Sequence, residues 1–139
     1  MYLLDTNVVS ELMKLTPSPN VMAWIDQAPS AALFISSVTQ AEILYGVELL
    51  PESKRRDALF GAAKTMFDSY FLGRVMPFDS DAAESFSVLA AGRKVLGRPI
   101  ALADAQIAAI AHCRGAILVT RNVLDFDHCG IEIVNPWEI

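Results

Sequence analysis

The chain has 139 residues, of which 53% are hydrophobic and 19% are charged, and its formal net charge is −5. This length matches one domain with its own core, so we expect residues 1–139 to form a single domain. No apolar run reaches the roughly 18 residues that span a bilayer. The N-terminus also lacks the charged segment and long apolar stretch of a signal peptide, which predicts a cytoplasmic protein without membrane contact.

The net charge argues against a nucleic-acid-binding surface, because phosphate contacts normally come from a basic face. The objection weakens if the acids gather in one pocket and the basic side chains lie elsewhere. These basic side chains are Lys54, Arg55, Arg56, Arg74, Arg93, Lys94 and Arg98. The high apolar fraction predicts a protein partner or a self-dimer. Cys113 and Cys129 are expected to be free thiols.

Short apolar runs alternate with amphipathic segments from the first residues onward. Pro17 and Pro19 separate two early helices, because proline interrupts a helix interior. Ser37 with Gln40 three residues later is a capping-box pattern, which predicts a helix start. The first half is predicted to contain a strand at 2–4, helices at 6–14 and 20–27, a strand at 33–36, and helices at 38–49 and 52–70.

The second half continues the alternation. Asp79 or Ser80 is expected to cap a helix that Gly97 stops, and Gly115 to end the next helix. The predicted elements are a strand at 74–78, a helix from 79 or 80 to about 96, a helix at 103–114, and strands at 116–120 and 132–134. This alternation predicts an α/β fold in which helices cover both faces of a parallel sheet.

Acidic and amide side chains follow the predicted strands. Asp5 ends the first strand, Glu42 lies just over a turn into the helix after the second, and Asp104 opens the helix before the fourth. Asn122 and Asp125 follow the fourth strand directly. Ligands bind beyond the carboxyl ends of parallel strands, so we expect these side chains to meet at one edge of the sheet.

Each acid alone has an ordinary explanation. Asp5 could cap the helix that starts near Thr6. Glu42 could pair with Thr39 in a shifted capping box, and Asp104 could favour a helix N-terminus. If the acids lie together, their repulsion must be offset, because two carboxylates about 4 Å apart repel by about 4 kcal/mol at an effective dielectric near 20. Either some acids stay protonated, or a hard cation such as Mg²⁺ or Mn²⁺ lies between them. We favour the cation, which can bind phosphate oxygens and activate water as a nuclease requires.

Four segments carry a family resemblance. They are L-L-D-T-N-V-V-S-E-L (Leu3 to Leu12), S-x-V-T-Q-A-E-I-L-Y-G (Ser36 to Gly46), P-I-A-L-A-D-A-Q-I-A-A-I-A (Pro99 to Ala111) and L-V-T-R-N-V-L-D-F (Leu118 to Phe126). They resemble PIN domains and, more narrowly, VapC-type toxins of the subgroup similar to FitB that ends in N-P-W. The motifs occur in order over essentially the whole chain, so the resemblance is specific.

The resemblance implies a three-layer α/β/α sandwich with strand order 3-2-1-4-5 and an endoribonuclease that depends on Mg²⁺ or Mn²⁺. Transfer RNA is the leading substrate. The implied partners are a VapB-type antitoxin, a second copy of the chain in a homodimer, and operator DNA for the assembled complex. Asp5, Glu42 and Asp104 match the family's three metal-site acids. The family often has a fourth acid where this chain has Asn122, so Asn122 and Asp125 share that candidate catalytic role.

Neighbouring residues are candidates for supporting roles. Thr6, Asn7 and Thr120 could orient the acids through hydrogen bonds, although an ordinary turn or cap role is favoured for Asn7. Basic side chains that could contact RNA phosphates are Lys54, Arg55, Arg56 and Arg121, with a solvated helix face as the alternative for the first three.

Two other features are assigned structural roles. Gly46 lies inside a predicted helix at a cost of about 1 kcal/mol relative to Ala, which predicts a close helix approach. The pairs His112–Cys113 and His128–Cys129 suggest zinc only weakly, because adjacent helical residues point about 100° apart.

Two other functions are open at this point. A phosphotransfer enzyme resembling haloacid dehalogenases would use Asp5 as an aspartate nucleophile, but it would show D-x-D where this chain has Asp5, Thr6 and Asn7. A non-catalytic subunit would bind an antitoxin through its apolar surface and keep the acids as structural residues. RNA cleavage by the purified chain separates these hypotheses from a nuclease.

Overall fold

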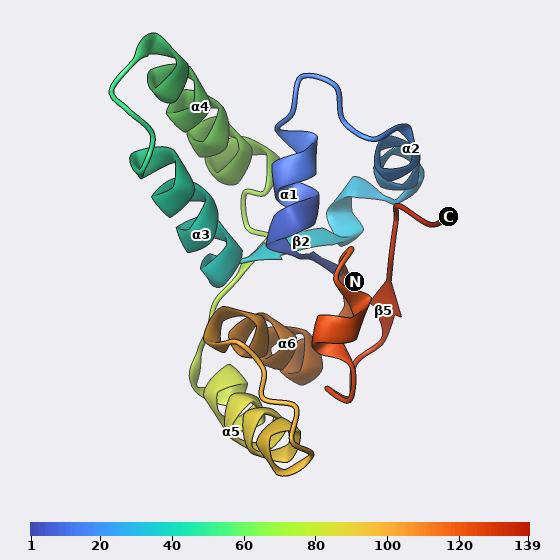
Figure 1. Ribbon diagram of the computed structural model, residues 1–139. Helices are drawn as coiled ribbons and strands as arrows, with labels where there is room; N and C mark the ends of the chain where they lie inside the picture. The colour runs from blue at the N-terminus through green and yellow to red at the C-terminus, as the bar shows by residue number, and fades with distance from the viewer.

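In a computed structural model that describes residues 1–139, strands and helices alternate along the chain and the strands form one sheet (Figure 1). The strands are β1 (Tyr2–Leu4), β2 (Leu33–Ser36), β3 (Val75–Met76), β4 (Ile117–Val119) and β5 (Ile133–Val134). They lie in the order β3-β2-β1-β4-β5, and every neighbouring pair is parallel. The predicted parallel sheet and its strand order are therefore confirmed.

Helices pack on both faces of this sheet. Figure 1 shows α1 to α4 on one side and α5 with α6 on the other. Their bounds are α1 (Thr6–Leu12), α2 (Pro19–Gln27), α3 (Ser37–Glu48), α4 (Lys54–Thr65), α5 (Ser80–Val95) and α6 (Leu102–Arg114). Three short helical segments complete the chain: η1 (Ser30–Ala32), η2 (Met66–Tyr70) and η3 (Val123–Phe126). No helix combines the length and the apolar composition that crossing a membrane demands.

Two apolar clusters, one on each face, come from the alternation of side chains along the strands. Leu3 of β1 packs in the cluster that includes α5 and α6, whereas the next residue, Leu4, packs in the cluster with α1 to α4. Leu118 and Val119 of β4 divide between the two clusters in the same way. Because both faces of the central strands are buried, the three-layer sandwich is confirmed.

Two details of the predicted helices are wrong. Ser36, not Ser37, caps α3: its Oγ accepts from the Thr39 amide at 3.0 Å, whereas the Ser37 Oγ accepts from the Phe78 amide at 3.2 Å. The predicted helix at 52–70 ends its regular part at Thr65 and continues as the π-helical segment η2.

The Arg74 side chain accounts for how η2 ends. Its guanidinium donates to the Leu33 carbonyl oxygen at 2.6 Å and also bonds the carbonyls of Ser30 and Tyr70. It lies over the rings of Tyr70 and Phe71, at 5.2 Å and 5.3 Å from their centroids. A single basic side chain thus joins the end of η2 to β2. These segments are about forty residues apart, so local helical periodicity could not predict the interaction.

The alanine substitution Leu118→Ala tests the core around β4. Leu118 is completely buried, so we expect this substitution to lower the free energy of unfolding by about 2–5 kcal/mol, through lost apolar burial and the cavity left behind. Leu15→Ala is the matched control, because Leu15 is fully exposed and its loss should change stability by no more than about 0.5 kcal/mol. Urea unfolding followed by circular dichroism measures both, and equal effects would contradict this description of the core.

Candidate functional site

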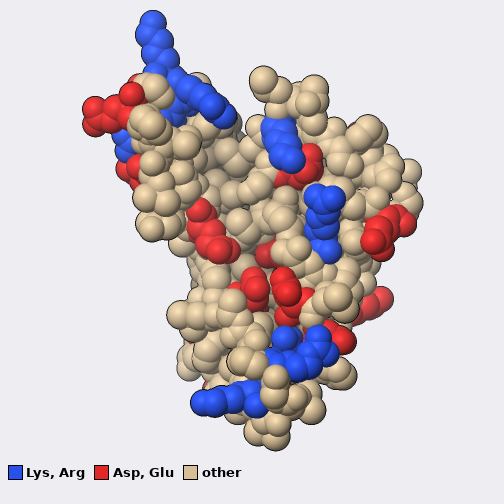
Figure 2. Space-filling view, viewed as in Figure 1, with Lys and Arg blue, Asp and Glu red and all other residues tan.

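The carboxyl ends of β1, β2 and β4 lie next to one another in the sheet, and polar residues follow each of them. Asp5 follows β1, Ser36 ends β2, and Thr120 follows β4. Figure 2 shows acidic side chains gathered in a hollow near the middle of this face, with basic side chains on either side. The sheet edge is thus the candidate site.

Asp5 is the buried member of the acidic group, with only 4% of its surface exposed. Its Oδ1 accepts from the Thr6 amide at 2.8 Å, as a helix cap does, and its Oδ2 accepts from the Thr120 hydroxyl at 2.8 Å and the Asn7 Nδ2 at 3.1 Å. Burial raises the pKa of Asp5 to about 6, the bonds from Thr120 and Thr6 oppose the rise, and the charges of Asp104 and Glu42 add to it. Asp5 therefore caps α1, and its surroundings disfavour the ionised form of its carboxyl.

Glu42 reaches the site from the exposed side of α3. The Thr6 hydroxyl donates to Glu42 Oε1 at 2.7 Å. Because that hydroxyl has a single proton, its 3.0 Å contact with the Thr39 hydroxyl must be a bond that Thr39 donates. The capping box between Glu42 and Thr39 is therefore wrong: Thr6 orients Glu42, and Thr39 orients Thr6.

Asp104 lies half-buried in the first turn of α6, as its capping alternative predicted. Burial raises its pKa, and the charges of Asp125 and then Glu42 raise it further. Asp125 belongs to η3 and is exposed. Asp5, Glu42, Asp104 and Asp125 are thus close enough for their charges to interact, although they come from four separate elements.

The donor set fits a hard cation in its chemistry. All four side chains offer carboxylate oxygens, which Mg²⁺ and Mn²⁺ prefer. Burial is the main cause of the raised pKa values of Asp5 and Asp104, and a cation among the acids would relieve the repulsion that adds to it. With the side chains as placed, no three acidic, histidine or cysteine groups are arranged to hold an ion. Ligation therefore requires the carboxylates to turn toward one another.

Thr120 and Asn7 connect the acids to the rest of the chain. The Thr120 Oγ1, which donates to Asp5, accepts from the Asn7 Nδ2 at 3.1 Å and from the Asn122 amide at 3.0 Å. Asn7 Oδ1 in turn accepts from the Arg121 amide at 3.3 Å. The turn or cap role favoured for Asn7 is not what the structure gives, since Asn7 joins Asp5 to the segment after β4. Asn122 contributes its main-chain N–H to this network, whereas its side chain is exposed.

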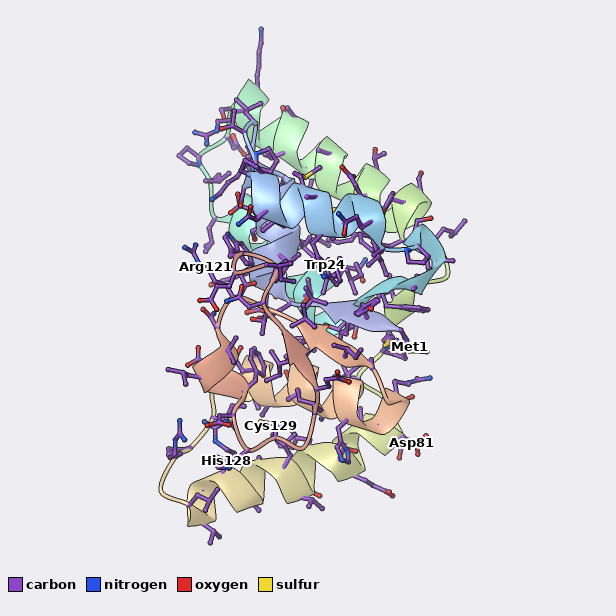
Figure 3. All side chains as sticks on the ribbon, turned by 90° about the vertical axis from the view of Figure 1, so that its right-hand side faces the viewer. Met1, Trp24, Asp81, Arg121, His128 and Cys129 are labelled. Carbon is purple, nitrogen blue, oxygen red and sulfur yellow. The ribbon has the colours of Figure 1, made fainter.

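The predicted basic residues divide into two places. Lys54, Arg55 and Arg56 lie at the start of α4, where Arg56 pairs with Glu48 at 2.6 Å. Arg121 lies beside the acidic site, with its guanidinium carbon 5.2 Å from the centroid of the Trp137 ring. Figure 3, which turns the acidic face to the left, shows Arg121 projecting at that edge. Arg121 lines a hollow together with Asp125, and Arg55 lines a groove together with Glu42, so both predicted phosphate contacts lie near an acid of the site.

Arg93 was named only as one of the basic side chains expected to lie away from the acidic pocket, and its burial was not predicted. It is buried and touches the segment that carries Asp125. A signal was available, because Arg93 lies four residues after Leu89, on the buried face of α5.

A groove extends from the acidic site between α1, α3 and α4, with a volume of about 730 Å³. Glu42 lines it together with Gly46, where a Cβ would meet nothing within 4 Å. No helix of this chain therefore approaches Gly46 closely, and packing of this glycine against a second copy of the chain in a dimer stays a prediction. The other lining residues are Ser10, Met13, Lys14, Leu15, Ile43, Val47, Leu50, Arg55 and Leu59.

Comparison with known proteins finds relatives over the whole chain. The PIN domain family matches residues 2–129. VapC ribonuclease Y4jK of Sinorhizobium fredii is 41% identical over 138 residues, which cover 99% of each chain. The tRNA(fMet)-specific endonuclease VapC of Shigella flexneri is 30% identical, with 98% of this chain and 97% of that protein covered. A solved structure of FitAB bound to a DNA fragment aligns with a TM-score of 0.94 and 34% identity, over 100% of this chain and 97% of its counterpart.

The raised pKa of Asp5 predicts how stability depends on pH in the absence of divalent cations. The folded chain binds the Asp5 proton more tightly than the unfolded chain does, since the pKa is about 6 rather than 3.8. This contribution is complete below about pH 4 and is lost as the pH rises through about 6, a change of about 3 kcal/mol. As the pH rises through this range, the free energy of unfolding of wild type minus that of Asp5→Asn should fall by up to this amount.

Urea unfolding in EDTA between about pH 4.5 and 8 measures this difference. Asp26→Asn is the control, because Asp26 is exposed on α2 and no pH-dependent difference is expected there. If the difference in the free energy of unfolding between wild type and Asp5→Asn stays constant with pH, the raised pKa of Asp5 is contradicted.

Proposed function

The chain belongs to the PIN domain family, with relatives of the VapC type over its full length, and on that premise we propose that it is the endoribonuclease toxin of a toxin–antitoxin pair. The single observation that carries the proposal is the acidic site at the edge of a parallel sheet: the buried carboxylate of Asp5 has Glu42 and Asp104 near it, and Asp125 lies near Asp104. Hydrolysis of an RNA phosphodiester bond is the chemistry that this site supports best.

The proposed cofactor is Mg²⁺ or Mn²⁺, held by Asp5, Glu42 and Asp104. When bound, such a cation neutralises phosphate charge and lowers the pKa of a coordinated water. Thr120 and Asn7 fix the Asp5 carboxylate through their bonds to Oδ2, and Thr6 fixes Glu42. Asp125, exposed beside Asp104, supplies a fourth carboxylate in place of an acid at Asn122, and its oxygens are available to accept a hydrogen bond from a water.

RNA is the proposed substrate, and transfer RNA is the class we favour. A relative that is 30% identical is named as a tRNA(fMet)-specific endonuclease, and its length matches this chain. Arg121, next to the acids, is suited to a phosphate of the bound strand, because a guanidinium offers paired donors to phosphate oxygens. The overall charge of −5 therefore does not oppose RNA binding, since the acids are gathered around the cation.

The proposed partner is a VapB-type antitoxin, and the groove between α1, α3 and α4 is its proposed binding site. The groove is lined by apolar side chains and ends at Glu42, so an apolar helical segment could fill it and direct a basic side chain toward the acids. A related structure contains FitAB on DNA, which supports a complex of toxin dimer and antitoxin on operator DNA.

Cleavage of RNA by the purified chain tests the proposed activity. We expect cleavage with Mn²⁺ or Mg²⁺ and none in EDTA. Asp5→Asn and Asp104→Asn should each lower the rate at least about 100-fold, because each removes a negative cation ligand. Circular dichroism checks that the variants fold, and Asp26→Asn, on the exposed face of α2, serves as the matched control.

Full activity in EDTA, or in folded Asp5→Asn, would refute the proposal. Folded wild-type protein that leaves RNA intact and cell growth unaffected would instead favour the non-catalytic binding subunit. A covalent aspartyl-phosphate at Asp5 would favour the phosphotransfer enzyme.

A glycine pair tests the groove. Gly46→Gln places a side chain in the groove, where a Cβ meets nothing within 4 Å, so the fold and the RNA cleavage rate should be retained while antitoxin affinity falls at least about tenfold. Gly61→Gln is the matched control, because Gly61 is also exposed, helical and free of neighbours within 4 Å, but lies outside the groove. Calorimetric titration with the cognate antitoxin measures both. Equal affinities for the two variants would place the antitoxin elsewhere.

A further inference from the structure

Arg93 of α5 is a buried cation without a carboxylate partner. It is 5% exposed, and its hydrogen bonds to oxygen all go to main-chain carbonyls. Moving a guanidinium out of water is costly unless its donors are satisfied, so such a residue needs an arrangement of acceptors built around it. The chain supplies that arrangement from the segment that follows β4.

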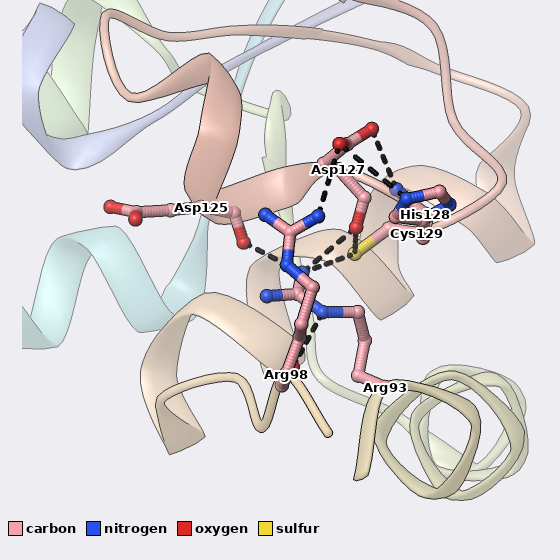
Figure 4. Close-up of polar contacts among 6 residues, drawn as sticks. All are labelled: Arg93, Arg98, Asp125, Asp127, His128 and Cys129. Atoms are coloured by element: carbon pink, nitrogen blue, oxygen red, sulfur yellow. Dashed lines mark hydrogen bonds and ion pairs between the residues drawn. The ribbon is translucent and has the colours of Figure 1, made fainter. Parts of the chain in front are cut away.

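Two carbonyl oxygens of this segment converge on one nitrogen of Arg93. The Arg93 Nη1 donates to the carbonyl oxygens of Asp125 and Asp127, both at 2.9 Å, and contacts the Cys129 Sγ at 3.6 Å. The Arg93 Nε donates to the Arg98 carbonyl at 2.7 Å (Figure 4). Arg93 therefore fixes the main chain at alternate residues of a segment without touching its carboxylates.

Two buried side chains hold the segment that carries Asp125: Phe126, which belongs to the segment, and Arg93, which belongs to α5. Phe126 is 1% exposed and packs in the apolar cluster that includes residues of α6. Arg93 holds the carbonyl of Asp125 from below, and Figure 4 shows the Asp125 carboxylate pointing away from the guanidinium. The bond to this carbonyl restrains the peptide plane after Asp125, which limits the main-chain conformation there and with it the direction of the Cα–Cβ bond.

That direction leads to the acidic site. Burial is the largest cause of the raised pKa of Asp104. The Asp125 carboxylate is the next largest, and its effect exceeds that of Glu42. The buried arginine thus holds the main chain of the segment whose Asp125 carboxylate acts on Asp104.

We propose that Arg93 is a positioning residue, which sets the Asp125 carboxylate beside Asp104 as an oxygen ligand, direct or through water, of the cation. The proposal rests on the proposed function, since it assumes that Asp5 and Asp104 bind the ion. Its basis is the pair of carbonyl bonds from Arg93 and the placement of Asp125 between them and the site. It also gives this chain a source for the fourth acid, which is displaced from Asn122 to Asp125.

The test compares Arg93→Lys with Arg98→Lys. Lysine keeps the charge but lacks the planar fork, so it cannot reproduce the bonds of Arg93 to three carbonyls. Arg98 is the matched control, because its exposed guanidinium contacts the Asp127 carboxylate of the same segment at 3.4 Å. We expect Arg93→Lys to lower Mn²⁺ affinity, measured from the electron paramagnetic resonance signal of free Mn²⁺, by about 10-fold or more, and Arg98→Lys by less than about 2-fold.

The background Asp125→Asn separates positioning from a general structural role. If Arg93 acts through Asp125, the loss of Mn²⁺ affinity caused by Arg93→Lys should nearly disappear in chains that already contain Asp125→Asn. A loss of the same size in both backgrounds would overturn the proposal, and so would an unchanged Mn²⁺ affinity in folded Arg93→Lys or in Asp125→Asn. Failure of the proposed function has a different signature: folded Asp5→Asn would then bind Mn²⁺ and cleave RNA like wild type.

A measurement on the wild-type chain keeps the proposal testable if Arg93→Lys does not fold. Amide hydrogen exchange at residues 125–129 should slow at least several-fold when Mg²⁺ is added, because a cation that binds Asp125 also restrains the segment that Arg93 holds. Exchange at these residues that is unchanged by Mg²⁺, while the amides around Asp5 respond, would overturn it.

Discussion

Asp5 is held almost out of water at the carboxyl end of β1, and two neighbouring acids add their charge to the cost of its burial. Hydrogen bonds from Thr120 and Thr6 offset only part of that cost, so the pKa of the carboxyl stays near 6. A bound metal cation would offset the remaining cost by favouring the ionised carboxylate. The other acids reinforce this preference, because each gains from the same positive charge.

The sheet makes this arrangement possible. Strand order β3-β2-β1-β4-β5 brings the ends of β1, β2 and β4 together, although more than eighty residues separate β2 from β4 along the chain. Three of the four acids are then supported by a residue from another segment: Thr120 bonds Asp5, Thr6 bonds Glu42, and Arg93 holds the main chain of Asp125. A precise group of like charges thus depends on contacts between distant parts of the sequence.

Much of this fold could be predicted from the sequence. Apolar runs, caps and glycine stops placed the helices and strands within a few residues, and the family resemblance gave the strand order that the structure confirms. Thr6, Asn7 and Thr120 could be named from the sequence as candidates for orienting the acids. Which atoms they bond could not be predicted, because Thr120 is more than a hundred residues from both Asp5 and Asn7. The contact of Arg74 with β2, at the end of η2, was missed for the same reason. The burial of Arg93 was missed although Arg93 shares the buried face of α5 with Leu89, because a charged side chain is seldom buried.

Crystals soaked in Mn²⁺ would test the central claim, that these carboxylates share one cation, by anomalous scattering. The account predicts an anomalous peak at the sheet edge, about 2.1 Å from carboxylate oxygens of Asp5 and Asp104, that is absent from crystals of Asp5→Asn. An occupied Mn²⁺ position elsewhere on the chain, with none between Asp5 and Asp104, would contradict it.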